Sequence, residues 1–223
     1  MAKVLIGYSA CPLTRAAFEQ QGHETWTCDL LPSRDASVFH ITSDVWEALN
    51  DNWDFAVLHP MCTYLTVSAA WAYGDGPYHQ KVRPGTLVGA ARRAERDKAI
   101  ENVRRLRALP FPVAIENPAP SFLNKAIGKP SQVIQPHQYG DDASKSTGLW
   151  LSEGVPLLVP TQHVEPRMVG KLPRWSNQTD SGQNRLIPGV NRWLERSATY
   201  PGIAAAMGDQ WGRWLNEKVR REA

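Results

Sequence analysis

Short apolar strands alternate with helical segments over the first half of this 223-residue chain. Apolar runs of strand length lie at residues 3–8, 25–28, 54–58 and 112–115. Between them, the residue types and apolar spacing of helices occur at residues 14–21, 44–49 and 90–109. This alternation predicts an α/β fold in which helices cover a doubly wound, mostly parallel sheet of the Rossmann-like type.

The pattern changes after Pro118, where turns become frequent. Brief apolar runs that could form short strands lie at residues 133–134, 148–151 and 157–159. Residues 160–196 are polar and rich in Pro, Gly, Asn and Gln, which is typical of loop. A final helix is expected over 200–217, because its apolar residues recur about every four positions and form one stripe.

The cysteines and the apolar runs indicate a cytoplasmic protein with reduced thiols. The three cysteines, Cys11, Cys28 and Cys62, are odd in number and have no zinc-ligand spacing. The first residues form too short an apolar run for a signal peptide, and no run reaches the roughly 18 residues of a membrane span. Basic residues crowd 92–107 and 213–221, either as solvated helix faces or as phosphate contacts.

Reactive side chains follow the ends of the expected strands, where ligands bind in parallel α/β sheets. Tyr8, Asp29, Cys62 and Glu116 all fall at such ends. Cys62 is either a buried, inert thiol or a thiolate that backbone N–H groups favour. Glu116 ends a buried strand, so its carboxylate needs a partner or a substrate unless it only caps the next turn. We expect Cys62 and Glu116 to lie close together as a reactive centre.

Two short segments carry a family resemblance. "LHPMCTYLT" and "AIENP" resemble the proline–cysteine and glutamate–asparagine motifs of DNA (cytosine-5) methyltransferases. Nearly the whole chain is similar to the short phage-encoded DNA cytosine methylases, through "VLIGYSACPLTRAAF", "GHETWTCDL", "HITSDVWEALNDNWDFAVLHPMC", "SKSTGLWLSEGVPLLVPT", "NQTDSGQNRL" and "RSATYPGIAAAMGDQWG". The resemblance implies a class I methyltransferase fold, with a catalytic domain over 1–159, a small DNA-recognition insert over 160–196 and a C-terminal helical part over 197–223 that packs back on it.

The resemblance assigns chemical roles to four residues. Cys62 would add to carbon 6 of cytosine, so that carbon 5 can attack an electrophilic methyl group. Glu116 would share a proton with the ring nitrogen N3, for which we expect its pKa to be raised. Asn117, with Pro118, would fix the turn that aims Glu116, and Lys145 would contact the base or its backbone. The target base would have to be flipped out of the duplex.

The methyl donor of this family is S-adenosylmethionine. Asp29 would bind the ribose hydroxyls and Asp44 the adenine amino group. The other expected cofactor residues are Tyr8, Ser9, Ala10, Cys11, Leu30, Val45, His59, Pro60 and Ile203. The first loop, Tyr8 to Pro12, lacks the two glycines of the family pattern, and Met61 stands where a second proline is usual. A different one-carbon donor, or a free deoxycytidine nucleotide as substrate, is therefore an alternative.

Double-stranded DNA is the expected partner of a chain that acts as a monomer. The residues expected to contact DNA are Thr63, Arg83, Arg167, Lys171, Arg174, Gln183, Asn184 and Arg185. The loop over 73–89, rich in Gly and Pro, is the expected lid over the flipped base. A degenerate member that only binds DNA is a further alternative, against which the presence of both Cys62 and Glu116 argues.

Overall fold

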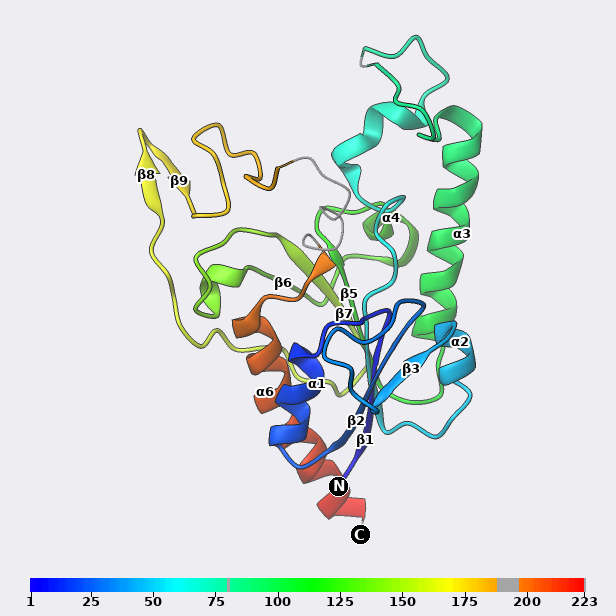
Figure 1. Cartoon of the computed structure of the whole chain (residues 1–223), viewed down its shortest axis with the longest axis vertical. Coiled ribbons are helices and arrows are strands. Elements are labelled where there is room, and N and C mark those ends of the chain that lie inside the picture. Colours follow the sequence, from blue (N-terminus) through cyan, green and yellow to red (C-terminus); the bar gives the residue numbers. More distant parts are fainter. Residues whose placement is uncertain (80, 188–196, 223) are drawn as a thin grey trace.

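A seven-stranded sheet forms the centre of the chain, whose residues 1–79, 81–187 and 197–222 are described by this computed structural model (Figure 1). Its strands are β1 (Lys3–Gly7), β2 (Glu24–Asp29), β3 (His40–Thr42), β4 (Phe55–Leu58), β5 (Val113–Pro118), β6 (Gln132–Ile134) and β7 (Thr147–Leu151). They lie in the order β3-β2-β1-β4-β5-β7-β6, and only β7 runs antiparallel to its neighbours. The expected Rossmann-like, mostly parallel α/β fold is confirmed by this strand order.

Helices cover both faces of the sheet. They are α1 (Leu13–Gln20), α2 (Val45–Ala48), α3 (Gly89–Arg107), α4 (Leu123–Ile127) and α6 (Pro201–Glu222). In Figure 1, α1 and α6 lie on one side of the sheet, and α2 and α3 on the other. Two core clusters match this arrangement: one joins Val4 and Ile6 of β1 to α6, and the other joins the alternating Leu5 to α2 and α3. Alternate residues of the buried strands therefore supply the two cores.

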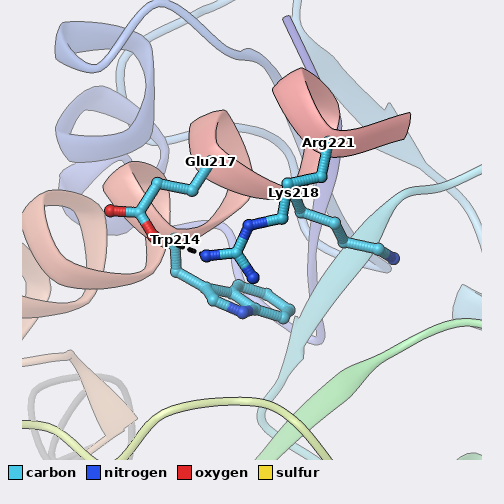
Figure 2. Close-up of a pocket in the computed structure, with 4 residues that line it drawn as sticks. All are labelled: Trp214, Glu217, Lys218 and Arg221. Carbon is cyan, nitrogen blue, oxygen red and sulfur yellow. Dashed lines mark ion pairs between the residues drawn. The ribbon is translucent and has the colours of Figure 1, made fainter. Parts of the chain in front are cut away.

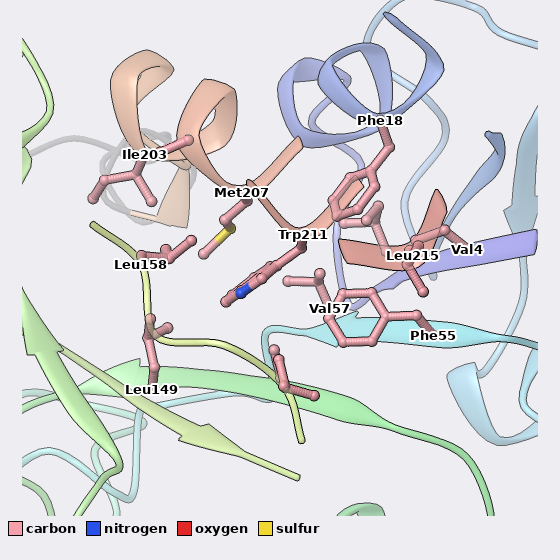
Figure 3. Packing of buried hydrophobic residues seen from close by; sticks show 14 of the residues in the cluster. Val4, Phe18, Phe55, Val57, Leu149, Leu158, Ile203, Met207, Trp211 and Leu215 are labelled. Carbon is pink, nitrogen blue, oxygen red and sulfur yellow. The ribbon is translucent and has the colours of Figure 1, made fainter. Parts of the chain in front are cut away.

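The C-terminal helix α6 is a structural part of the main unit. Figure 3 shows Trp211 and Leu215 of α6 directed at the side chains of β1, β4 and α1, and Met207 beside Leu158. Trp211 is fully buried and meets the ring of Phe55 edge to face at 5.6 Å. These contacts join α6 to the first strands and to α1 through one core cluster. Because it begins beside the carboxyl edge of the sheet, α6 also brings Ile203 to that edge.

Two features of the later part of the chain differ from the sequence-based expectations. Residues 157–159 form no strand, although Leu158 is buried, because Leu158 bonds the side chain of Gln132 rather than a neighbouring backbone. The segment expected to be mostly loop contains the hairpin of β8 (Arg167–Val169) and β9 (Leu172–Arg174). Residues 188–196 of the expected recognition insert, together with 80 and 223, lie outside the described residues.

Candidate active site

The carboxyl edge of the sheet gathers the candidate residues. The chain runs from β1 to β2 in one direction and returns to β4 on the other side of β1, so a crevice is expected beyond these two strands. β4 pairs with β5 in a register that sets Leu58 against Ile115. The segment from His59 to Cys62 therefore follows β4 at the side of β5, and Glu116 lies within β5, two residues before its end. Because β7 is antiparallel, it begins at this same edge, with Lys145 two residues before it.

A buried asparagine joins the turn before Cys62 to β5. Asn117 is 0% exposed, and its Nδ2 donates a hydrogen bond of 2.9 Å to the backbone oxygen of Pro60. The backbone oxygen of Cys62 then accepts from the N–H groups of Leu65 and Thr66. These bonds fix the backbone on both sides of the thiol. Cys62 itself is half-buried, whereas Cys11 and Cys28 are buried, so it is the most accessible of the three.

Glu116 is held between two basic side chains. His59 Nδ1 lies 3.3 Å from Glu116 Oε2, and both side chains are largely buried, at 11% and 17% exposure. Burial raises the pKa of Glu116, but the hydrogen bond from His59, the charges of Lys145 and His59 and the hydroxyl of Thr147 lower it further, to about 2. Our expectation of a raised pKa is therefore wrong. The hydrogen bonds and the neighbouring basic groups outweigh desolvation here, and Glu116 is a carboxylate at neutral pH.

Lys145 has its backbone fixed from three sides. Its own N–H donates to Gln135 Oε1 at 3.0 Å, and its carbonyl accepts from the hydroxyl of Thr147 at 3.1 Å. The preceding residue, Ser144, exchanges two hydrogen bonds with the side-chain amide of Asn177. Such a segment presents its side chain in one direction at little further entropic cost. The charge of Lys145 lowers the pKa of Glu116, and the expected role of Lys145 at the reactive centre stays a prediction.

A small hollow connects these residues to α6. It is lined by Glu116, Lys145, Thr147, Ser197, Thr199, Tyr200, Ile203 and Met207. Lys145 Nζ lies 6.0 Å from the ring centre of Tyr200, whose hydroxyl accepts from Asn177 Nδ2 at 3.2 Å. Ile203 therefore faces Glu116 and Lys145 as well as the core. Gln135, Asn177 and Tyr200 were not singled out from the sequence, since each approaches the centre only through tertiary contacts.

The loop after β1 replaces the missing glycines by a strained residue. Tyr8 has a φ of 59°, in the left-handed region, and its hydroxyl bonds Asn102 of α3. Ser9 N–H donates to the backbone oxygen of Cys28, and Ser9 Oγ accepts from Cys11 N–H. Ala10 and Cys11 are buried. A positive φ at a side-chain-bearing residue costs about 1 kcal/mol or more, which is typical of ligand loops rather than of simple turns.

The ends of β2 and β3 carry the two expected nucleoside-binding acids. Asp29 is half-buried and accepts from the N–H of Leu31, and the adjacent Leu30 is 74% exposed. Asp44 is exposed and accepts from Trp46 N–H, so it also caps α2, while Val45 is buried under it. A carboxylate beside an exposed apolar side chain, one strand from the crevice, fits the hydroxyls and the base of a nucleoside. These residues therefore fit the nucleoside part of S-adenosylmethionine.

Three arginines of α3 hold the loop that follows Cys62. Arg92 is 6% exposed and donates to the backbone oxygens of Thr63 and Leu87. Arg93 donates to the backbone oxygen of Tyr73 at 2.6 Å and pairs with Asp75. Arg96 lies over the ring of Tyr73 at 5.4 Å. These members of the basic cluster are thus structural anchors whose side chains are at least partly buried. The loop includes the expected lid, where Arg83 is exposed.

The expected DNA contacts on the insert fall into two groups. Arg167, Arg174 and Arg185 bond within the insert: Arg167 pairs with Asp180 at 2.7 Å, and the others donate to backbone oxygens there. Lys171 and Gln183 are exposed, as is Asn184, whose side chain accepts from Leu186 N–H. Figure 1 shows the β8–β9 hairpin projecting away from the sheet. Thr63, next to Cys62, is also exposed.

A second hollow lies at the other end of α6. Figure 2 shows it lined by Trp214, Glu217, Lys218 and Arg221, with an ion pair between Arg221 and Glu217. It lies near the chain termini, away from the carboxyl edge of the strands (Figure 1).

Within the described ranges, no group of three or more His, Cys, Asp or Glu residues could hold a metal ion, and no helix could cross a membrane.

Comparisons with known proteins give a likeness in structure. No family model matches the chain, and no curated protein matches it. Among solved structures, the crystal structure of the S. pombe Dnmt2 methyltransferase is similar, with a TM-score of 0.38 and 15% identical residues. The match covers 67% of this chain and 48% of that one, so the chain spans about half the length of the structure it matches. The proposals below depend on the strand order and on the side chains at the carboxyl edge.

Proposed function

We propose that this chain is a cytosine-5 methyltransferase that acts on DNA through a covalent bond between Cys62 and the base. The observation that carries the proposal is the bond from Asn117 to Pro60, which seats the Cys62 turn against the strand that bears Glu116. A thiol, a carboxylate and a cation at one strand edge are the groups that addition to a pyrimidine ring needs. Lys145 supplies the cation, since its charge acts on Glu116.

Each group has a task that its surroundings support. The Cys62 thiolate forms a bond to carbon 6, the electron pair of the 5,6 double bond moves toward carbon 4, and N3 gains a proton. Glu116 binds at N3, where it stabilises the protonated ring, and Lys145 balances the charge of the carboxylate. Carbon 5 then becomes nucleophilic. After it has gained its new substituent, a water molecule acting as base takes its proton, the 5,6 double bond re-forms and the bond between carbon 6 and sulfur breaks to release the thiolate. The half-buried position of Cys62 gives a flipped base access to the thiol.

The proposed donor is S-adenosylmethionine, which supplies an electrophilic methyl group when bound. Asp29 would hold the ribose hydroxyls and Leu30 would cover one face of the base, as their exposure at the end of β2 supports. The Tyr8–Cys11 loop would line the pocket, and Ile203 would close it from α6. Asp44 Oδ1 accepts from the Trp46 N–H, so its other carboxylate oxygen, Oδ2, would bind the adenine amino group.

The proposed partner is duplex DNA. The projecting β8–β9 hairpin has the width of a two-stranded ribbon, which the major groove of DNA admits. Lys171 lies in its turn, and Gln183 and Asn184 are exposed beside it. Arg167 and Arg174 form hydrogen bonds within the insert, so their proposed role is to stiffen it and not to contact bases.

The test is to incubate the purified protein with cytosine-containing duplex DNA and S-adenosylmethionine, and to analyse the digested nucleosides by mass. A gain of one methylene unit on deoxycytidine supports the proposal. A Cys62→Ala variant should lose this product, whereas Cys28→Ala, a buried thiol of the core, should keep it. Modification only with another donor or only on a free nucleotide, or DNA binding without any product, would replace the proposal by the corresponding alternative.

A further inference from the structure

His59 is fixed at the junction of β1 and β4, directly against the candidate carboxylate. Its backbone N–H donates to the oxygen of Gly7 at 3.0 Å, which extends the pairing of these strands by one residue. Its ring nitrogen Nδ1 lies 3.3 Å from Glu116 Oε2, although the two residues are 57 positions apart in the sequence. The position of His59 therefore follows from the sheet and not from a flexible loop.

The other ring nitrogen of His59 is buried and has no hydrogen-bond partner within the described part of the chain. An imidazole that had only to neutralise or anchor Glu116 would normally have both nitrogens satisfied, because a buried polar atom without a partner costs about 1–3 kcal/mol. The arrangement leaves Nε2 ready for a water or substrate atom and Nδ1 committed to the carboxylate. A histidine in this arrangement can take up a proton at one ring nitrogen and release one at the other.

The proposed reaction needs a proton that Glu116 does not itself hold. Its neighbours keep the carboxyl ionised at neutral pH. Lys145 also faces Glu116, where its charge favours the carboxylate. Tyr8, the titratable side chain that follows β1, is engaged with Asn102 of α3. Histidine is the neighbour whose proton is exchangeable at neutral pH.

We propose that His59 is a catalytic proton store, which loads Glu116 when cytosine is bound and takes the proton back when the product forms. This rests on the function proposed above. As Cys62 Sγ bonds to carbon 6, the 5,6 π pair shifts to the bond between carbons 4 and 5. The former N3–C4 π pair takes up the Glu116 proton at N3. The His59 Nδ1–H bond breaks toward Glu116, which leaves a neutral imidazole. During elimination the proton returns from N3 through Glu116 to His59.

The test measures exchange of the carbon 5 hydrogen of cytosine with solvent, in DNA and without a methyl donor. The thiol adduct makes carbon 5 basic, so that addition, protonation and elimination replace this hydrogen. Tritium release from labelled duplex DNA would be followed between about pH 5 and pH 9, across the range in which histidine titrates. Because no methyl donor is present, the exchange rate reports on the roles of Cys62, Glu116 and His59 independently of donor binding.

His59→Gln keeps a hydrogen-bond donor to Glu116 but cannot pass on a proton. We expect its exchange rate to fall by about 100-fold or more, the usual contribution of a general acid or base. We expect the wild-type rate to decline toward high pH and this decline to be absent in His59→Gln. In His59→Ala, added imidazole should restore at least about one tenth of the wild-type rate, which a structural role would not allow.

The outcomes separate the two proposals. If wild type and Cys62→Ala both lack exchange and methyl transfer, the proposed function fails and the role of His59 fails with it. If Cys62→Ala alone is inactive but folded His59→Gln keeps the wild-type rate and pH profile, only the proton store is wrong. A rate loss in His59→Gln with an unchanged pH profile and no rescue by imidazole would likewise overturn it. Circular dichroism and thermal unfolding would establish that both His59 variants fold.

Discussion

The side-chain amide of Asn177 pairs with the backbone of Ser144 as a neighbouring strand would. Ser144 N–H donates to Asn177 Oδ1 at 3.0 Å, and Asn177 Nδ2 donates to the Ser144 oxygen at 2.9 Å. Asn177 belongs to the candidate recognition insert, and Ser144 directly precedes Lys145. The insert that we expect to meet DNA is therefore bonded to the backbone of the residue that precedes the proposed catalytic lysine.

Removing the two hydrogen bonds between Asn177 and Ser144 should weaken turnover more than DNA binding. In Asn177→Ala, Ser144 loses both partners and Lys145 loses its fixed direction toward Glu116. We expect the turnover number to fall by about 10-fold or more, as a loss of roughly 1.4 kcal/mol at the transition state, while DNA affinity changes by less than about 3-fold. Single-turnover rates and DNA titrations measure the two effects. Lys171→Ala is the comparison, because it should weaken binding and leave turnover intact. If Asn177→Ala lowers turnover and DNA affinity equally, these hydrogen bonds do not serve mainly to position Lys145.

Asn117 should matter for stability as well as for the thiol. Its substitution by Ala leaves the Pro60 oxygen without a donor at a buried site, which costs about 1–3 kcal/mol. The Cys62 turn also loses its tether to β5, so the exchange rate should fall with it. Asn124→Ala is a matched control, because Asn124 Oδ1 is buried without a partner and its removal should cost little. Urea unfolding of both variants decides between them, and similar losses would contradict this explanation.

The lowered pKa of Glu116 makes the stability of the fold depend on pH. The carboxyl titrates near 2 in the folded chain and near its ordinary value of 4.5 when unfolded. Because the folded pKa is the lower one, this stabilisation is fully present above pH 4.5 and is lost as the pH falls toward 2. It amounts to at most about 3 kcal/mol.

Glu116→Gln removes this titration. We expect the difference in unfolding free energy between wild type and the variant to shrink as the pH falls from about 5 to about 3. Urea unfolding at several pH values measures the difference. Glu153→Gln, an exposed carboxyl in a turn, is the matched control and should show no such trend. A difference for Glu116→Gln that stays constant with pH would mean that its carboxylate is not held by His59 and Lys145.

The first half of the fold follows from local sequence because each buried strand is one apolar run. The runs that end at Gly7, Asp29 and Leu58 could be recognised, and the rule for parallel sheets then brings Cys62 and Glu116 to one edge. The strand β3 and the helix α4 were missed, since three to five residues are too few to show a period. The β8–β9 hairpin was missed for the same reason, with Pro173 inside it masking the pattern.

The electrostatics of the site could not be derived from sequence. The pKa of Glu116 depends on His59 and Lys145, which reach it from β4 and from the start of β7. The direction of its shift is the balance of burial against these two charges, and each is set by tertiary distance. His59 was expected only as a cofactor residue, although a histidine at a strand end, one residue from the Cys62 turn, was a usable signal.

The contact between α1 and α6 should be sensitive to a single methyl group. A Cβ on Gly208 would lie 2.4–2.6 Å from the Cβ, C and O atoms of Ala17, two of which are backbone. Gly208→Ala should therefore destabilise the chain by about 1–3 kcal/mol, although alanine is the better helix former by about 1 kcal/mol. Gly212→Ala is the milder change in the same helix, because its Cβ would meet side-chain atoms of Gln21 at 2.8 Å and no backbone atom that close. Thermal unfolding should rank wild type and Gly212→Ala above Gly208→Ala. If Gly208→Ala is as stable as Gly212→Ala, α6 does not approach α1 this closely, and the seat of Ile203 and Tyr200 at the site would need revision.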